Sequence, residues 1–346
     1  MLLAVVAAVA VMLVGVPGAE AMPDTGGPAC VRHDTTATLT PGLASPRYRI
    51  AGWLCTPPHP NGTVQVLLSG YTYDHTYWTT PDPAADWVSA ALGSGQSVYM
   101  IDRVGVGASG KPPADQITAD TEATVTHQIV TGLRDGTIGH YRTVVGVGHS
   151  YGSIVWMAEA ASHHDVDALV LTGILHGLSP DQITAFANDL HPAADDPKFA
   201  NTALPAGYLT TQPGTRAGFF LDAQTALPGA AAWDEASKST GTSGELTFTP
   251  ETETGYSKHI RVPVLTIVGA DDALLCTTDL PCGTGAQLCQ RERPDYAATT
   301  PLAMASIPET GHSITLHRTA PIAEAIANQW ITHPAGRTPG VTTCRS

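Results

Sequence analysis

The chain has 346 residues, of which 43% are hydrophobic and 14% are charged, so it can bury a large core and lacks the composition of a disordered protein. Its formal net charge is −14 (17 basic minus 31 acidic side chains), which repels phosphate backbones and argues against nucleic-acid binding. The length suits one large domain, or a core domain with an insertion.

The first 21 residues have the pattern of a secretory signal peptide. Met1 to Val16 is almost wholly apolar, Pro17-Gly18 breaks the run, and Ala19-Glu20-Ala21 fits an A-x-A cleavage site. The apolar run is shorter than the ~20 residues that a membrane span requires. Although no Lys or Arg precedes this run, we expect a secreted (extracellular) chain that starts at Met22 and has no stable membrane anchor.

Short apolar runs then alternate with helical patterns, which is typical of an α/β fold with a mainly parallel central sheet flanked by helices. Strands buried on both faces are predicted at Thr63–Ser69, Ser97–Asp102, Thr143–Gly148, Ala168–Thr172 and Val262–Val268. Helices are predicted at 87–92, at 121–133, after Ser153, and from Pro321 onward, where Ile322, Ile326 and Trp330 recur every fourth residue.

Residues 176–258 differ from their surroundings. They are rich in Pro, Gly, Thr and Ala, show no clear buried strand, and fall between two predicted core strands. We interpret them as an inserted cap. The expected organisation is a signal peptide (1–21), a first part of the core (22–175), the cap (176–258), and a second part of the core with the C-terminal tail (259–346).

Six cysteines, an even number, indicate disulfide bonds in an exported chain. The first two, Cys30 and Cys55, flank a predicted β-hairpin and are the preferred pair. Two of the next three (Cys276, Cys282 and Cys289) are expected to close a local loop, which leaves the third for Cys344. The spacing of these three differs from the C-x2-C pairs of zinc sites, so a metal site made of cysteines is disfavoured.

The motif Gly148-His149-Ser150-Tyr151-Gly152 fits G-x-S-x-G and lies between a predicted strand and a predicted helix. Such a turn is strained, and its glycines let neighbouring backbone approach the serine closely. The helix that starts there directs its first amides toward the serine, so the backbone N–H of Tyr151 can bind a developing oxyanion. We predict that Ser150 is a nucleophile.

A serine hydroxyl needs a base, and the base needs an orienting acid. His312 lies after the short apolar run at 303–307 and before the last helix, where a strand ends. Asp272 follows the strand at 262–268 and is the favoured acid, with Asp271 as the alternative. The chain order Ser, Asp, His is the order of the G-x-S-x-G enzymes and differs from those of chymotrypsin and subtilisin.

The turn after the first core strand reads Ser69-Gly70-Tyr71-Thr72-Tyr73. Gly70 permits close approach, and the backbone N–H of Tyr71 is the expected second oxyanion donor. Tyr73, Tyr77 and Trp78 belong to the same aromatic-rich loop and are predicted to line the substrate pocket. The alternative is that these rings pack beneath the loop.

Gly105-Val-Gly107-Ala-Ser-Gly110 fits the dinucleotide-binding pattern G-x-G-x-x-G. Lys111-Pro112-Pro113 follows it, and proline prevents the helix that would hold a pyrophosphate. Nucleotide binding is therefore rejected.

Together these motifs resemble the α/β-hydrolase superfamily over roughly 62–331, the cap excepted. Asp102-x-x-Gly105-x-Gly107-x-Ser109 is similar to the family's D-x-x-G-x-G-x-S loop, 148–152 to its nucleophile elbow, Gly269-x-x-Asp272 to its acid turn, and Gly311-His312 to its histidine loop. Many members have His-Gly where this chain has Ser69-Gly70, which puts the geometry of the oxyanion turn in question.

The resemblance implies a secreted serine esterase or lipase-like enzyme that cleaves a small ester or lactone through an acyl-enzyme, without a metal or organic cofactor. The alternatives are an exported aminopeptidase-like serine peptidase and an acyltransferase. A peptidase would need an acidic side chain to capture the substrate amine, and the candidates in the cap are Asp189, Asp195, Asp196, Asp222, Asp234 and Glu235. The complete Ser-Asp-His set argues against a non-catalytic binding module. The natural substrate and the oligomeric state do not follow from the sequence.

Overall fold

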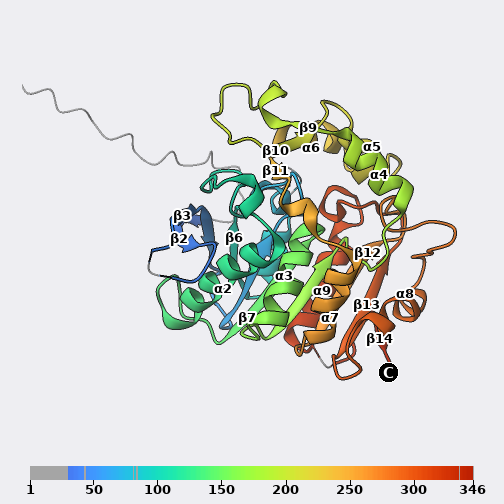
Figure 1. Cartoon of the computed structure of the whole chain (residues 1–346). Helices are drawn as coiled ribbons and strands as arrows, with labels where there is room; N and C mark the ends of the chain where they lie inside the picture. Colours follow the sequence, from blue (N-terminus) through green and yellow to red (C-terminus); the bar gives the residue numbers. More distant parts are fainter. Residues whose placement is uncertain (1–29, 43, 81, 83–84, 335, 346) are drawn as a thin grey trace, which may run out of the picture.

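The computed structural model describes residues 30–42, 44–80, 82, 85–334 and 336–345 (Figure 1). The predicted signal peptide lies outside these residues. Within the described ranges, no helix combines the length and the apolar character that crossing a membrane would require.

A nine-stranded sheet organises the described chain, with strand order β1-β4-β6-β5-β7-β8-β12-β13-β14. The central pairs from β6 to β13 are parallel, and the pairs β1–β4, β4–β6 and β13–β14 are antiparallel. The strands are β1 (Cys30–Arg32), β4 (Gly52–Cys55), β5 (Thr63–Leu68), β6 (Ser97–Ile101), β7 (Thr143–His149), β8 (Ala168–Thr172), β12 (Val264–Gly269), β13 (Leu302–Ile307) and β14 (Thr342–Cys344). The predicted α/β class with a mainly parallel sheet is therefore confirmed.

Helices cover both faces of this sheet. On β5, the side chain of Gln65 hydrogen-bonds Trp87 of α1 and Asn328 of α9. The next residue, Val66, lies beside Gly146 of β7. A Cβ on Gly146 would lie 2.5 Å from Trp156 of α3. Because successive strand residues face opposite sides, α1 and α9 cover one face and α3 the other. The helices are α1 (Trp87–Gly93), α2 (Ala119–Asp135), α3 (Tyr151–Ser162), α7 (Pro250–His259), α8 (Gly285–Glu292) and α9 (Ala320–Thr332).

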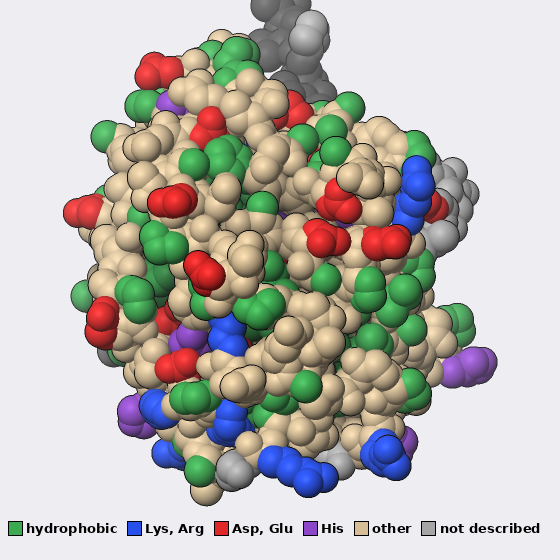
Figure 2. All heavy atoms as spheres, turned by 90° about the vertical axis from the view of Figure 1, so that its right-hand side faces the viewer, with side chains coloured by type: hydrophobic (Ala, Val, Ile, Leu, Met, Phe, Trp, Pro, Cys, Tyr) green, Lys and Arg blue, Asp and Glu red, His purple; other side chains and the backbone are tan. Residues whose placement is uncertain are grey.

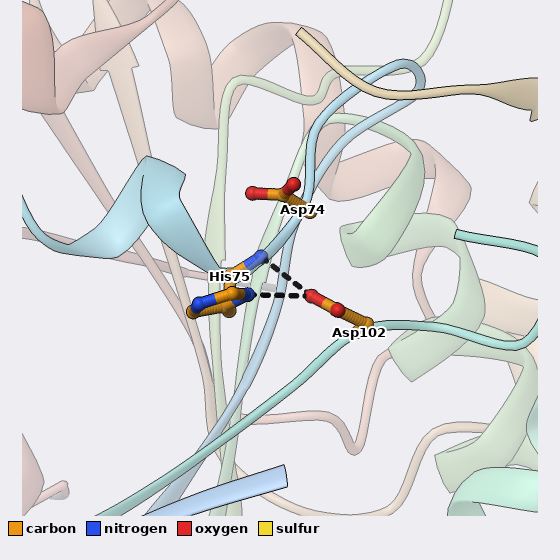
Figure 3. Close-up of side chains that lie close together, drawn as sticks. All are labelled: Asp74, His75 and Asp102. Carbon is orange, nitrogen blue, oxygen red and sulfur yellow. Dashed lines mark hydrogen bonds and ion pairs between the residues drawn. The ribbon is translucent and has the colours of Figure 1, made fainter. Parts of the chain in front are cut away.

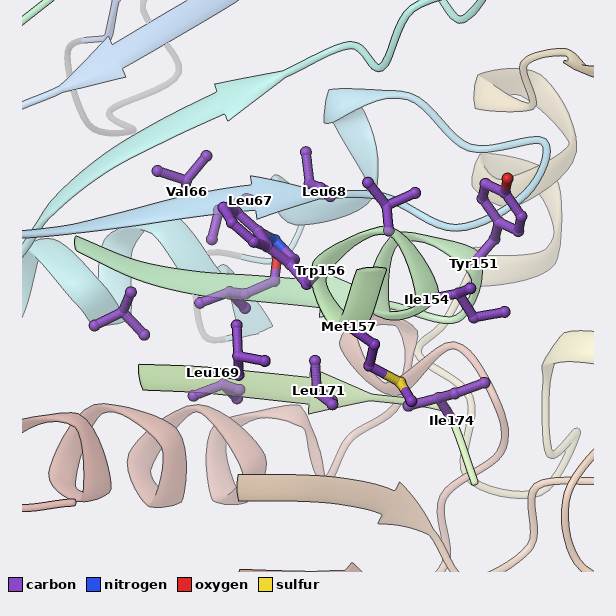
Figure 4. Close-up of a cluster of buried hydrophobic side chains, with 14 of the residues drawn as sticks. Val66, Leu67, Leu68, Tyr151, Ile154, Trp156, Met157, Leu169, Leu171 and Ile174 are labelled. Atoms are coloured by element: carbon purple, nitrogen blue, oxygen red, sulfur yellow. The ribbon is translucent and has the colours of Figure 1, made fainter. Parts of the chain in front are cut away.

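The core between α3 and the sheet is apolar and closely packed (Figure 4). Val66 and Leu68 of β5, Leu169 of β8, and Trp156 and Met157 of α3 are all less than 3% exposed. Burying side chains of this size contributes about 1.5–3 kcal/mol each. The packing holds α3, which begins directly after Ser150, against the centre of the sheet.

The three disulfides agree with the predicted pairing: Cys30–Cys55, Cys276–Cys282 and Cys289–Cys344. Cys30 lies directly opposite Cys55 in the β1–β4 pair. Between these strands the chain forms the expected hairpin, made of β2 (Thr35–Thr38) and β3 (Arg47–Ile50).

The 176–258 segment runs from the end of β8 to the last helix before β12, and most of it lies above the carboxyl ends of the central strands (Figure 1). It contains α4 (Pro180–Asp189), α5 (Arg216–Phe220), α6 (Ala230–Ser237) and a three-stranded sheet of β9 (Leu190–Pro192), β10 (Tyr208–Thr211) and β11 (Gly241–Thr242). Its last helix, α7, instead packs against α3.

The expectation that this segment lacks a buried strand is wrong for β10. Tyr208, Thr210 and Thr211 are each no more than 2% exposed. Two of these buried residues are threonines, whose hydroxyls are satisfied by hydrogen bonds: Thr210 donates to the carbonyl of Ser239, and Thr211 accepts from Arg216. A hydrophobic pattern could not reveal a strand whose buried side chains are polar.

Candidate active site

Ser150 lies at the tight turn from β7 to α3 and has φ 52° and ψ −122°. A non-glycine residue with positive φ is strained, and such strain is typical of functional sites. The turn depends on the flanking glycines, because a Cβ on Gly148 would lie 2.5 Å from the Cα of Ser153 and one on Gly152 would lie 2.2 Å from the carbonyl oxygen of Leu68. The side chain of Ser150 is thereby presented at the end of the sheet, half-buried.

His312 and Asp272 form a buried pair at the same end of the sheet. The Nδ1 of His312 is 2.8 Å from the Oδ2 of Asp272, whose Oδ1 accepts a hydrogen bond from the backbone of Leu274. Asp272 is fully buried, whereas Asp271 is exposed and forms no hydrogen bond or ion pair with His312 among the described residues. Of the two acids considered, the structure thus brings Asp272 to the imidazole.

The end of β8 brings Ser150 and His312 near one another. The backbone N–H of Ser150 donates to the carbonyl of Thr172, and a Cβ on the next residue, Gly173, would lie 3.3 Å from the Cε1 of His312. In the described part of the chain, no hydrogen bond joins the Ser150 hydroxyl to His312. The Nε2 of His312 has no partner there either, so this nitrogen is available as an acceptor.

Two backbone N–H groups lie beside Ser150 without a hydrogen-bond partner among the described residues: those of Tyr71 and Tyr151. Gly70 brings the first close, since a Cβ on this glycine would lie 3.0 Å from the Cβ of Ser150. The turn is held by Arg103, which donates to the carbonyls of Ser69 (2.9 Å) and Gly70 (3.1 Å).

Arg103 is the centre of a buried charge cluster that the sequence analysis did not identify. Its guanidinium, 2% exposed, pairs with Glu122 of α2 and with Glu245 of the 176–258 segment, and lies 5.0 Å from the centre of the Tyr151 ring. Burial would lower the pKa of Arg103, but the two carboxylates hold it above its usual value. One cation therefore connects the turn at 69–73, α2 and the 176–258 segment.

The predicted pocket residues Tyr73, Tyr77 and Trp78 are all buried. Tyr77 stacks on His149 with ring centres 4.2 Å apart, and the Tyr73 hydroxyl hydrogen-bonds Ser313 at 2.8 Å. Trp78 packs edge-to-face on Trp87 of α1 instead. Their burial agrees with the alternative that these rings pack within the protein.

His149 has a defined tautomer. Thr172 donates its hydroxyl hydrogen to the carbonyl of Gly148 (3.0 Å), so the Nδ1–H of His149 donates to the Thr172 oxygen at 3.2 Å. Burial, together with His312 nearby, lowers the pKa of His149 well below its usual value. The ring, 4.9 Å from that of His312 between centres, therefore stays neutral and adds no positive charge beside His312.

Aromatic side chains of the 176–258 segment surround this region. Phe220 lies 5.7 Å from the His312 ring and contacts Phe186 of α4, which in turn packs on Tyr71. Phe219 packs on Phe186, and Phe248 lies 6.0 Å from Tyr151. All five phenylalanines of the chain fall between residues 186 and 248, a compositional signal that the sequence analysis did not use.

The same segment is clamped to the turn that carries Tyr71. Arg216 of α5, fully buried, forms two hydrogen bonds with Asp234 and one with the hydroxyl of Thr72, and it lies 4.4 Å from the centre of the Tyr73 ring. The Tyr71 hydroxyl donates to the carbonyl of Thr242. The 176–258 segment therefore helps to hold the turn at 69–73 in place.

The other acidic candidates of the segment are mostly engaged as well. Asp196 and Glu235 pair with Lys238, Asp189 accepts from Thr215, and Asp222 accepts from the Thr225 hydroxyl and the Gln224 backbone. Asp195 is exposed.

The glycine-rich loop 102–110 serves as a structural turn. Asp102, at its start, accepts hydrogen bonds from the backbone and the Nδ1 of His75 (Figure 3). It also accepts one from the backbone of Ala108. A Cβ on Gly107 would lie 2.2 Å from the Oδ2 of Asp102, so glycine is required there. The next residue after Asp102 is Arg103, and the loop places its side chain against the turn at 69–73.

Solved structures share this fold at low sequence identity. The monoacylglycerol lipase of Paleococcus ferrophilus matches with a TM-score of 0.56 and 15% identity, covering 81% of this chain and 98% of its own. The enol-lactonase of Burkholderia xenovorans LB400 matches with a TM-score of 0.56 and 16% identity (83% and 97%), and the bromoperoxidase of Bacillus anthracis with 0.54 and 16% (87% and 98%).

A search of curated proteins gave no significant match. The sequence model of the Alpha/beta hydrolase family, however, matches residues 65–325, well over half of the chain and the region that carries Ser150, Asp272 and His312. The fold, the turn at Ser150 and this match together show that the chain belongs to the alpha/beta hydrolase family.

Proposed function

We propose that the protein is a secreted serine hydrolase that cleaves esters or lactones. Ser150 attacks the carbonyl, His312 takes the hydroxyl proton at Nε2 and passes it to the leaving alcohol, and Asp272 holds Nδ1–H toward itself. The N–H groups of Tyr71 and Tyr151 bind the oxyanion, and water then releases the acyl group from Ser150.

The observation that carries this proposal is the strained Ser150 (φ 52°) beside a buried His312–Asp272 pair. Strain of this kind costs about 1–3 kcal/mol, and a serine that merely caps a helix would not need it. The hydroxyl–imidazole hydrogen bond is expected to form with substrate present, because such bonds are often long in the free enzyme.

The surroundings favour a neutral, apolar ester. Phe220 lies next to His312 and is part of an aromatic cluster with Phe186, Phe219 and Tyr71, which suits an apolar acyl or alcohol group. The 176–258 segment carries ten acidic and four basic side chains (4 − 10 = −6), and acidic side chains spread over the upper part of the face in Figure 2. This charge disfavours anionic substrates.

Ester cleavage is preferred over release of N-terminal residues from peptides. Capture of a substrate ammonium needs a carboxylate free to pair with it, but Asp234, Asp196 and Glu235 already pair with Arg216 or Lys238. Secretion is supported by the predicted signal peptide and by the three disulfides, which are typical of exported proteins.

The test is labelling with a fluorophosphonate, which reacts with activated serines, followed by rates on p-nitrophenyl esters and aminoacyl anilides. Wild-type protein should be labelled and should hydrolyse esters faster than anilides, whereas Ser150→Ala should lose the label and about three orders of magnitude or more in kcat. Ser162→Ala, at the exposed far end of α3, is the matched control and should behave as wild type. Labelling that survives Ser150→Ala would reject the assignment.

A further inference from the structure

Three side chains from separate elements meet where α2 passes the C-terminal end of α3. His127 belongs to α2, Glu159 to the last turn of α3, and Asp165 to the loop that leads to β8. One atom of each that could bind a metal lies within 4.8 Å of those of the other two. The Nδ1 of His127 is 2.6 Å from the Oδ2 of Asp165.

Glu159 lacks the donors that a buried carboxylate normally has, whereas Asp165 has one partner, the Nδ1 of His127. Glu159 is fully buried, and neither of its oxygens, nor the Oδ1 of Asp165, accepts a hydrogen bond from a described residue. The nearby Arg134 binds the backbone carbonyl of Asp165 (2.9 Å) and the carboxylate of Asp167 (2.7 Å) instead. A buried carboxyl group beside a second carboxyl group is stable only with a proton or a cation between the two.

We propose that His127, Glu159 and Asp165 bind a divalent metal ion, with zinc as the expected species. An imidazole and two carboxylates are ligands that zinc accepts, whereas magnesium and calcium prefer oxygen ligands alone. The ion can reach the site, because the side chains of His127 and Asp165 are 38% and 25% exposed. The ring of His163 stacks 4.0 Å from that of His127 and helps to hold the imidazole in place.

A second cluster, also of one histidine and two acidic residues, shows what distinguishes this site. Asp74, His75 and Asp102 also lie close together (Figure 3). There, however, both oxygens of Asp102 accept hydrogen bonds from His75 and Ala108, and the Oδ1 of Asp74 accepts from Thr76. With these acceptors already occupied by N–H and O–H donors, this second cluster does not need a cation and offers a matched control.

The metal is expected to stabilise the fold without entering the reaction. Ser150 caps the N-terminus of α3 and His163 its C-terminus, so the 12-residue helix separates the two sites by about 18 Å. The ion would join α2, α3 and the loop before β8. Because a metal that binds the native state shifts the unfolding equilibrium, stability is the property to measure.

The experiment uses the mature full-length protein, dialysed against a chelator and then titrated with zinc chloride. Bound zinc is measured by elemental analysis after removal of excess metal, and Tm is measured with and without zinc at about 100 times Kd. We expect one zinc per chain and a rise in Tm of about 5 °C. Both should be lost in His127→Ala and Glu159→Gln and kept in His75→Ala.

The proposal is overturned if the wild type retains no zinc, or if His127→Ala and Glu159→Gln retain it as the wild type does. A proton shared by the two carboxyl groups would then explain the cluster. Because His127 is partly exposed, His127→Ala keeps the test decisive even if a change at the buried Glu159 prevents folding. The outcome does not depend on the reaction proposed for Ser150.

Discussion

The hydrogen bond between Asp272 and His312 assigns the imidazole protons, and so decides which nitrogen can act as a base. With Nδ1–H donated to the carboxylate at 2.8 Å, the lone pair is on Nε2. The exposed Asp271 next to it makes no such contact within the described chain. Neighbouring acids with different surroundings therefore offer a direct test of the acid assignment.

Asp272→Asn should reduce kcat for ester hydrolysis by about 10³–10⁴, because the amide can place the hydrogen on the wrong nitrogen while the fold persists. Asp271→Asn should remain within a few-fold of wild type. Steady-state kinetics with circular dichroism as a folding check would measure this. The reverse ranking of the two variants would assign the acid to Asp271.

The residues predicted to do the chemistry were accessible from the sequence because each sits in a short local pattern. Gly148 to Gly152 and Asp272 need only their immediate neighbours to be recognised. Arg103 could not be found in this way, since its partners Glu122 and Glu245 lie 19 and 142 residues away. The aromatic ring of Phe220 reaches His312 through tertiary contacts, which no local pattern reveals. Tyr73 and Tyr77 were predicted from their shared loop; both are buried, and their role in substrate binding stays a prediction.

Among the elements, the loop 102–110 connects the sheet to the turn at 69–73. It begins directly after β6, and its Arg103 binds the backbone of that turn. This side chain satisfies two backbone carbonyls and two buried carboxylates at once. Burial raises the pKa of Glu122, with Arg103 opposing the shift. Removing the cation would leave these acceptors without their donor inside the protein.

Arg103→Gln should therefore lower the free energy of unfolding by about 3–5 kcal/mol, measured by urea denaturation. Adding Glu122→Gln to this variant should recover part of the loss, because one of the two uncompensated carboxylates is removed. Arg32→Gln, which breaks an exposed pair with Asp34, should cost less than about 1 kcal/mol. Equal effects at Arg103 and Arg32 would contradict the structural role of the buried cluster.

Long apolar runs made the central strands predictable, and β5, β6, β7, β8 and β12 each lie within two residues of the predicted bounds. The missed strands are short or polar. β14 has three residues, Thr342–Cys344, and owes its place at the sheet edge to pairing with β13 and to the disulfide that ends in Cys344. Neither cause is visible as a pattern within the strand.

For the molecule as a whole, a buried acid on α7 makes stability depend on pH. Glu253 is 2% exposed and its Oε1 has no partner among the described residues. Burial raises the pKa of Glu253 from 4.5 to about 7, with His176 opposing the shift. Because the folded-state pKa is the higher one, the stability that Glu253 contributes is complete below pH 4.5 and is lost as the pH rises through 7.

Glu253→Gln should accordingly gain about 3 kcal/mol relative to wild type on going from pH 4 to pH 8. Thermal unfolding of both proteins at the two pH values measures this difference. Glu251→Gln, an exposed change on the same helix, should show no comparable gain. If the difference in Tm between wild type and Glu253→Gln were the same at both pH values, ionisation of Glu253 would not be the cause of the pH dependence.

Both margins of the nine-stranded sheet are held by covalent bonds: Cys30–Cys55 ties β1 to β4, and Cys289–Cys344 ties β14 to α8. Each marginal strand has only three residues and shields the backbone groups of the strand beside it. In a reducing compartment these strands could detach, and the uncovered N–H and C=O rows of β4 and β13 would become templates for pairing between chains. Formation of the two disulfides thus protects the protein from self-association as well as from unfolding.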